Sequence, residues 1–153
     1  GQVQIANWNS PEQIVISGHK AAVEDVVRNV RSVKSVMLPV SAPFHSGLMK
    51  DAEDRLAADL DAVEFHDPAF PVITNVDARM IRTGAEARDA LKRQVSRPVL
   101  WTKSMELLAG EEIDAFIEFG PGKVLCGLIK RIGKGWAPPF TVRSIEDADA
   151  LDK

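Results

Sequence analysis

The sequence feature that most constrains the fold is a nearly continuous apolar run at residues 113–119, directly followed by Gly120-Pro121-Gly122. A run with so little polar alternation is typical of a strand buried in a parallel sheet. The next segment, 123–132, is apolar at helical spacing and has a proline near its start. Because a parallel sheet needs helices on its faces, this region predicts an α/β fold.

The segments upstream of this run extend the same prediction. Apolar side chains recur every three or four positions over 46–63, 87–95 and 101–109, which predicts three helices. Pro68 and Pro71 bracket a break in the helical pattern, and residues 70–75 have the composition of a strand. The resulting order from residue 70 onward is β-α-α-β-α. We therefore assign residues 41–153 to one flank of an α/β core.

The first 40 residues have a different pattern. Two partly alternating runs, 3–8 and 13–17, are separated by a turn-forming cluster, which predicts an antiparallel hairpin. A helix is expected over 20–33 and a short strand over 36–38. This β-β-α-β order is most of a ferredoxin-like α+β subdomain that lacks its first strand and helix. Residues 1–40 are thus predicted to form a partial subdomain whose N-terminal portion is missing.

Composition excludes several classes of function. A chain of 153 residues fits one domain, and its net charge of −3 gives no basic surface for nucleic acid. No apolar stretch approaches the roughly 20 residues that span a bilayer, so no membrane association is expected. The single cysteine, Cys126, lies within a predicted helix and is expected to be a small core residue. It rules out an internal disulfide, which agrees with a cytoplasmic setting.

His45 is the strongest candidate for chemistry. It lies between a predicted strand end and a predicted helix start, next to Pro43, and loops at strand ends often carry reactive groups in α/β proteins. A neutral imidazole there can take and return a proton. The alternative is a histidine that caps the helix or packs in a polar pocket. Ser46, at the helix start, is interpreted as a cap.

The other possible sites are weaker. The nucleophile motif G-x-S-x-G is absent from the sequence, and His19 and His66 are expected to be surface residues. No histidine has partners at a metal-ligand spacing, so no metal site is predicted. Gly120-Pro121-Gly122 before a helix either binds an anion through backbone N–H groups or is a tight turn, and we favour the turn.

Four dispersed blocks resemble a known family, the malonyl-CoA:acyl carrier protein transacylases. They occur in the family's order and spacing and comprise residues 7–11 with 13–18, 41–49, 94 with 98–101, and 118–125. The resemblance implies an α/β-hydrolase-like core with an inserted ferredoxin-like subdomain. It also implies malonyl transfer from coenzyme A, through a serine ester, to the phosphopantetheine thiol of acyl carrier protein in fatty acid synthesis. Coenzyme A enters as a thioester substrate, and no cofactor is implied.

The resemblance also assigns roles to residues. His45 matches the general base and acid, and Gln94 matches the residue whose backbone carbonyl orients the imidazole. Asn7 and Asn9 match asparagines that line the cleft, although local turn chemistry explains them equally well. Phe44 matches a position that influences the choice of acyl group, where a ring disfavours an α-methyl branch; core packing is its alternative role.

The sequence also lacks residues on which the family's reaction depends. The family's nucleophilic serine, the arginine that pairs with the malonyl carboxylate and the oxyanion-hole donors belong to its N-terminal half. We therefore expect this chain to be inactive alone and to need the missing N-terminal half as a partner. Two alternatives stay open: a non-catalytic module that binds carrier protein or supports an assembly, and an acyltransferase segment of a polyketide synthase.

Overall fold

The computed structural model describes residues 1–31, 34–111 and 113–147. Helices and strands are mixed along the chain, and the strands form three two-stranded sheets within the described part. The elements are β1 Val3–Ser10, β2 Gln13–Gly18, α1 Lys20–Asn29, a 3-10 turn η1 Gly47–Met49, α2 Lys50–Asp61, β3 Val72–Thr74, β4 Arg79–Ile81, α3 Gly84–Gln94, α4 Trp101–Ala109, β5 Ala115–Phe119, α5 Val124–Ile132 and β6 Thr141–Ile145.

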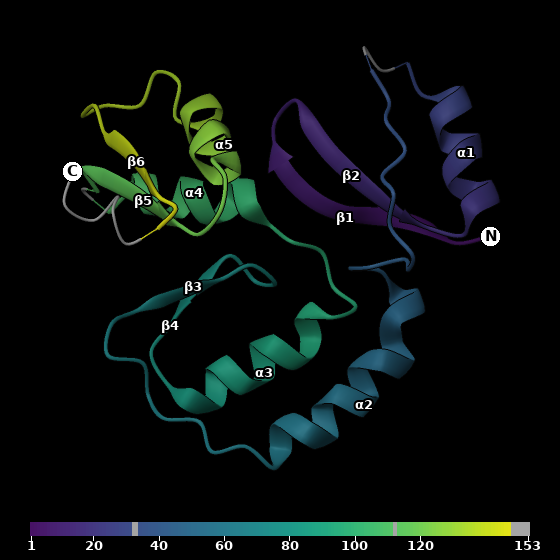
Figure 1. Cartoon of the computed structure of the whole chain (residues 1–153), viewed down its shortest axis with the longest axis horizontal. Coiled ribbons are helices and arrows are strands. Elements are labelled where there is room, and N and C mark those ends of the chain that lie inside the picture. Colours follow the sequence, from purple (N-terminus) through teal and green to yellow (C-terminus); the bar gives the residue numbers. More distant parts are fainter. Residues whose placement is uncertain (32–33, 112, 148–153) are drawn as a thin grey trace.

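The N-terminal hairpin forms as the sequence predicts. β1 and β2 pair antiparallel around a two-residue turn, and α1 follows directly after them (Figure 1). α1 is shorter than predicted because the backbone of Val30 is already extended. Residues 32–33 of the predicted helix lie outside the described residues. The prediction of a strand over 36–38 is wrong: Val36, Met37 and Leu38 are 52–64% exposed and pair with no described strand.

Two helices and a small hairpin form the middle of the chain. α2 packs against α3, and Arg88 of α3 donates to the Val63 carbonyl at the end of the α2 segment, at 3.0 Å. α3 begins with a capping box, in which Thr83 and Glu86 satisfy each other's backbone N–H groups. Hydrogen bonds from the Arg82 backbone, and from the Arg79 and Thr83 side chains, lower the pKa of Glu86 to about 2.

The hairpin β3–β4 leads into this capped helix. The strand predicted over 70–75 is present as β3, whereas the three-residue strand β4 was not predicted. A short two-stranded ribbon has too few residues to produce a detectable alternation.

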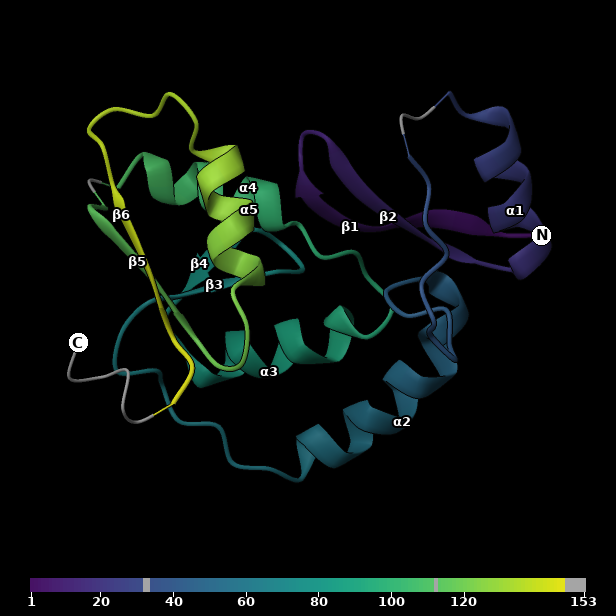
Figure 2. The same cartoon turned by 45° about the horizontal axis from the view of Figure 1, so that its top comes forward.

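The C-terminal part is a parallel β-α-β unit. β5 and β6 pair in parallel, and α5 connects them and packs against both (Figure 2). Buried Leu128 and Ile129 of α5 belong to the core of this unit. The parallel strand over 113–119 is confirmed, but its predicted burial is wrong, because Phe119 is 70% and Ile117 is 49% exposed. The strand β6 was not predicted.

Backbone hydrogen bonds join the N-terminal hairpin to the segment after α3. Trp8 donates to the Val99 carbonyl at 2.9 Å, and Val99 donates to the Ala6 carbonyl at 2.8 Å, so the segment after α3 runs parallel beside β1. The division into residues 1–40 and 41–153 stays a prediction. None of the described helices is long and apolar enough to cross a membrane.

We predict opposite effects for alanine at two helical glycines. A Cβ at Gly84 would lie 2.3 Å from the Phe65 carbonyl oxygen, so Gly84→Ala should lower the free energy of unfolding by about 1–3 kcal/mol. A Cβ at Gly127 meets no atom within 4 Å, so Gly127→Ala should raise it by up to about 1 kcal/mol through helix propensity. Urea unfolding of both variants checks the pair, and equal shifts would contradict the packing at Gly84.

Candidate functional site

His45 lies in a backbone conformation that is unusual for a residue with a side chain. Its φ is +56°, in the left-handed region, and such a conformation persists only where neighbours hold it. The Ser46 hydroxyl donates to the Pro43 carbonyl at 2.7 Å, and the Gly47 N–H donates to the Gln4 side chain at 3.0 Å. The interpretation of Ser46 as a cap is wrong: its buried hydroxyl closes the turn around His45 and makes no cap bond.

The half-buried imidazole of His45 contacts the backbone of Gln94. Nδ1 lies 3.0 Å from the Gln94 carbonyl oxygen. Because a carbonyl oxygen only accepts hydrogen bonds, Nδ1 must carry the proton. In the neutral ring this leaves Nε2 without a proton, so Nε2 is the nitrogen that can receive one.

The sequence explains why this carbonyl is available. In a continuing helix the carbonyl of Gln94 would accept from the N–H of residue 98, but residue 98 is proline and has none. The last bond of this type runs from the Arg97 N–H to the Arg93 carbonyl, at 3.1 Å. The spacing of Gln94 and Pro98 therefore leaves a carbonyl at the helix end that the imidazole satisfies.

The side chain of Gln94 has a separate, local role. Its Nε2 donates to the carbonyls of Arg97 at 3.0 Å and Pro98 at 3.4 Å, which closes the turn after α3. The amide thus caps the end of the helix and leaves the backbone carbonyl to His45.

The three predicted substrate-binding residues lie on two segments: Asn7 and Asn9 on β1, and Phe44 in the loop before η1. The backbone of Asn7 forms an isolated parallel β-bridge with Val99, in the segment that follows Gln94. Strand β1 therefore lies beside the segment that contacts His45. Asn9 lies two residues further along β1, at a register shift, and is half-buried. Phe44 precedes His45 and is 47% exposed, so the alternative of core packing does not describe it in this chain. The roles of all three stay predictions.

A buried carboxylate near His45 was missed by sequence reasoning. Glu53 of α2 is 8% exposed and accepts from the Ser96 hydroxyl and, at 2.6 Å, from Lys50. Burial raises the pKa of Glu53, but the hydrogen bonds from Lys50 and Ser96 outweigh it and hold that pKa below 4.5. The Glu53–Ser96 contact ties the helix after His45 to the turn after Gln94. The sequence signal that could have identified Glu53 is its position on the apolar face of the helix predicted over 46–63.

The turn at Gly120-Pro121-Gly122 is not a free anion site. The Glu118 carboxylate accepts from the backbone N–H groups of Leu125 at 3.0 Å and Cys126 at 2.8 Å, at the start of α5. The Cys126 N–H bond is the main reason why the pKa of Glu118 is lowered. Because an acidic side chain already occupies these donors, the interpretation as a tight turn is favoured.

The remaining candidates have structural roles. Cys126 is buried, and its burial raises the pKa of the thiol, which disfavours the nucleophilic thiolate. His19 is exposed and accepts from the Gln2 N–H at 2.9 Å, and the His66 side chain is 82% exposed. The described residues hold no cluster of metal-ligating side chains.

Comparison with known proteins gives consistent results. The malonyl CoA-acyl carrier protein transacylases of Escherichia coli K12 and Haemophilus influenzae are 47% and 42% identical, covering 85% and 99% of this chain. The crystal structure of the Synechocystis malonyl-CoA:ACP transacylase covers 99% of the chain at 38% identity, with a TM-score of 0.91. The chain is a homologue of malonyl-CoA:acyl carrier protein transacylases. The predicted resemblance and the α/β fold class are thereby confirmed.

Two further findings qualify this homology. The chain spans about half the length of the transacylases that it matches, 43% and 49% of the two sequences above and 50% of the Synechocystis chain. Another similar structure is a type II PKS acyl-carrier protein in complex with its malonyl-transacylase, at 38% identity and a TM-score of 0.89. No family model matches the chain.

We predict that the buried carboxylate stabilises the chain only above acidic pH. Glu53→Gln keeps the shape but removes the charge that Lys50 and Ser96 satisfy, so the free energy of unfolding at pH 7 should fall by about 1–3 kcal/mol. Because the folded-state pKa is lowered, this contribution is present above pH 4.5 and disappears as the pH falls through the folded value.

Urea titrations at a series of pH values measure this difference. The matched control is Glu64→Gln, which changes a carboxylate whose side chain is 83% exposed and should leave stability unchanged. A Glu53→Gln difference that persists unchanged at low pH would contradict the charged contact.

Proposed function

We propose that this chain forms the histidine-bearing half of a malonyl-CoA:acyl carrier protein transacylase of fatty acid synthesis. The observation that carries the proposal is the His45 imidazole held by the Gln94 carbonyl, in a chain homologous to transacylases. The names of the similar proteins support malonyl-CoA and acyl carrier protein as substrates. A cytoplasmic setting remains our prediction.

In the proposed reaction His45 moves one proton in each of two transfers. Its Nε2 takes the proton of a serine hydroxyl as the serine oxygen bonds to the malonyl thioester carbon; the C–S bond breaks and the proton goes to the coenzyme A sulfur. The phosphopantetheine thiol of the carrier protein then gives its proton to Nε2 as its sulfur bonds to the malonyl carbon. The C–O bond of the serine ester breaks, and the serine oxygen takes the proton back from Nε2.

The N–H at Nδ1 has a defined function in this scheme. When Nε2 is protonated the ring becomes a cation, and the Gln94 carbonyl stabilises the charge while it fixes the orientation of the ring. A neutral carbonyl does this without a buried counter-charge. Asn7 and Asn9 would line the acyl cleft, and Phe44 would crowd an α-methyl group and favour malonyl by about 1–3 kcal/mol.

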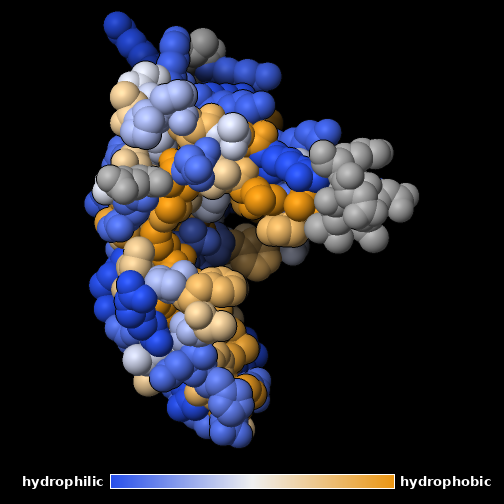
Figure 3. All heavy atoms as spheres, turned by 90° about the vertical axis from the view of Figure 1, so that its left-hand side faces the viewer, coloured by the Kyte–Doolittle hydropathy of each residue, from blue (hydrophilic) through white to orange (hydrophobic). Residues whose placement is uncertain are grey.

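The serine must come from polypeptide outside this chain, and the apolar surface supports such a partner. Hydrophobic residues gather along the concave side of the molecule in Figure 3. Phe119 and Val124, at the end of β5 and the start of α5, are 70% and 69% exposed, and the described part of the chain pairs β5 only with β6. We propose that the missing N-terminal half covers this surface, because its exposure costs about 25 cal/mol per Å² of apolar area.

A chimaera tests the proposal. The chain replaces the segment that it matches in the Escherichia coli transacylase, and malonyl transfer from malonyl-CoA to carrier protein is measured. We expect the chimaera to transfer malonyl and His45→Ala to reduce turnover by about 10²–10⁴-fold. His66→Ala, which changes an exposed histidine, is the matched control and should leave the rate unchanged.

Two results would contradict the proposal. If His45→Ala transfers malonyl at the rate of the unaltered chimaera, His45 is not the base. If the chimaera folds and binds carrier protein but transfers nothing, the alternative of a non-catalytic binding module is favoured. Parallel assays with a fatty-acid carrier protein and a polyketide carrier protein separate the two pathways.

A further inference from the structure

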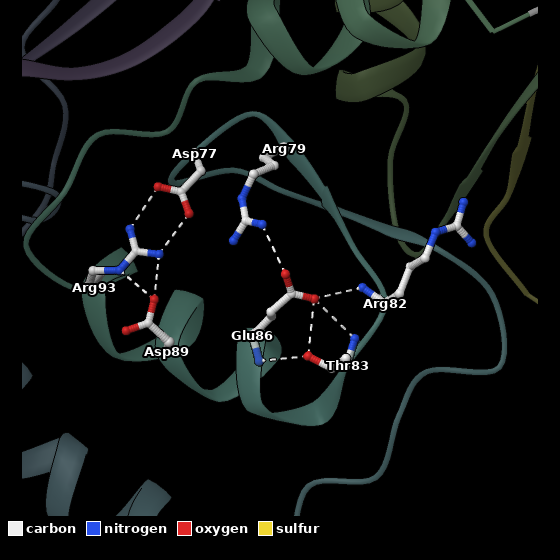
Figure 4. A network of polar contacts seen from close by, with 7 residues as sticks. All are labelled: Asp77, Arg79, Arg82, Thr83, Glu86, Asp89 and Arg93. Carbon is white, nitrogen blue, oxygen red and sulfur yellow. Dashed lines mark hydrogen bonds and ion pairs between the residues drawn. The ribbon is translucent and has the colours of Figure 1, made fainter.

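In the last turn of α3, next to Gln94, Arg93 forms a charge cluster with two carboxylates. Arg93, the residue before Gln94, donates from its two terminal nitrogens to both carboxylate oxygens of Asp77, each at 2.7 Å. Its Nε donates to Asp89 at 2.8 Å. Figure 4 shows the Arg93 guanidinium between these two carboxylates.

The contact between Arg93 and Asp77 is bidentate and partly buried. The side chains of Arg93 and Asp77 are 31% and 28% exposed, and a bidentate guanidinium–carboxylate contact fixes direction as well as distance. Hydrogen bonds from Arg93 lower the pKa of Asp77, so the pair stays charged at neutral pH. By comparison, Arg79 of β4 contacts Glu86, in the first turn of α3, through one nitrogen at 2.9 Å, and its side chain is 54% exposed.

The partner carboxylate lies on a rigid part of the fold. Asp77 is in the β3–β4 turn, where Ala78 has a φ of +50° and donates to the Thr74 carbonyl at 2.8 Å. The same turn holds the chain after Gln94, because the Leu100 N–H donates to the Asn75 carbonyl at 2.8 Å. The β3–β4 turn therefore holds the segment 94–99 from both ends.

The position of the Gln94 carbonyl depends on this clamp. Beyond the Arg97–Arg93 bond, Pro98 removes the next backbone bond, so the helix alone does not hold the Gln94 carbonyl in place. We propose that Arg93, through Asp77 and Asp89, is a positioning residue that fixes the Gln94 carbonyl and thereby the orientation and tautomer of the His45 ring. Its catalytic consequence rests on the proposed function, whereas its effect on the ring does not.

Loss of the clamp has a defined consequence. Without Arg93 the last turn of α3 frays, the carbonyl moves relative to Nδ1, and the proton no longer has one preferred nitrogen. Substrate binding elsewhere is unaffected. A displacement of about 1 Å in such a contact reduces turnover by up to about a hundredfold, so kcat should change while KM does not.

The experiment uses three variants of the chain, alone and within the chimaera. Arg93→Met keeps the length and removes the charge, and Arg93→Lys keeps the charge but loses the bidentate geometry. Arg79→Met, on β4 and paired with Glu86 at the start of α3, is the matched control. Nitrogen-15 signals of the His45 ring report its tautomer in the chain. Steady-state kinetics of the chimaera report kcat and KM.

We expect Arg93→Met to mix the two tautomers and to lower kcat by about tenfold or more at unchanged KM. Arg93→Lys should lie between it and the unaltered protein, and Arg79→Met should match the unaltered protein in both readouts. The proposal is overturned if the tautomer of Arg93→Met is unchanged, or if Arg79→Met changes it equally. A chimaera that is inactive without any substitution contradicts the proposed function, and the tautomer measurement then decides the positioning role by itself.

Discussion

The geometry of the site depends on one hydrogen bond, from Nδ1–H of His45 to the Gln94 carbonyl. It joins two segments that are 49 residues apart in sequence, and each is held by its own structure. On one side a closed turn maintains the left-handed backbone of His45. On the other, α3 ends at Gln94 and Pro98 has no N–H for its carbonyl. In the proposed function, a carbonyl left unpaired by helix termination would take the part that a carboxylate has in a protease triad.

Polar groups are buried close to this contact and are satisfied by hydrogen bonds of their own. A carboxylate such as Glu53 is expensive to bury, and here its hydrogen bonds from Lys50 and Ser96 offset that cost while they join α2 to the turn after α3. The β3–β4 hairpin also holds the segment after α3, through the hydrogen bond from the Leu100 N–H to the Asn75 carbonyl. Surface that is not involved in this contact, at β5 and the start of α5, remains open and apolar. The chain is therefore extensively hydrogen-bonded around the histidine and exposes apolar side chains at β5 and the start of α5.

Periodicity in the sequence predicted those helices and strands that their own local sequence determines. The hairpin β1–β2, the helices α2 to α5 and the parallel strand β5 were predicted because spacing and turn residues determine them locally. The strand expected over 36–38 failed, since a strand needs a neighbour and no described segment pairs with it. Burial of β5 failed for the same reason, because a parallel strand is buried only when further strands and helices cover it.

For the site, local sequence indicated His45, and only the family resemblance indicated Gln94. The spacing between Gln94 and Pro98 is visible in the sequence, but it does not identify a site until the hydrogen-bond partner of the Gln94 carbonyl is known. The charge cluster of Arg93 depends on a hairpin folding back onto α3, which no local pattern encodes.

The position of the imidazole proton tests this account most directly. Neutron diffraction from crystals of the chain, grown in heavy water at neutral pH, would locate the deuterium on the His45 ring. The account predicts deuterium on Nδ1, directed at the Gln94 carbonyl, and none on Nε2. Deuterium on Nε2 alone, or a ring turned away from that carbonyl, would contradict it.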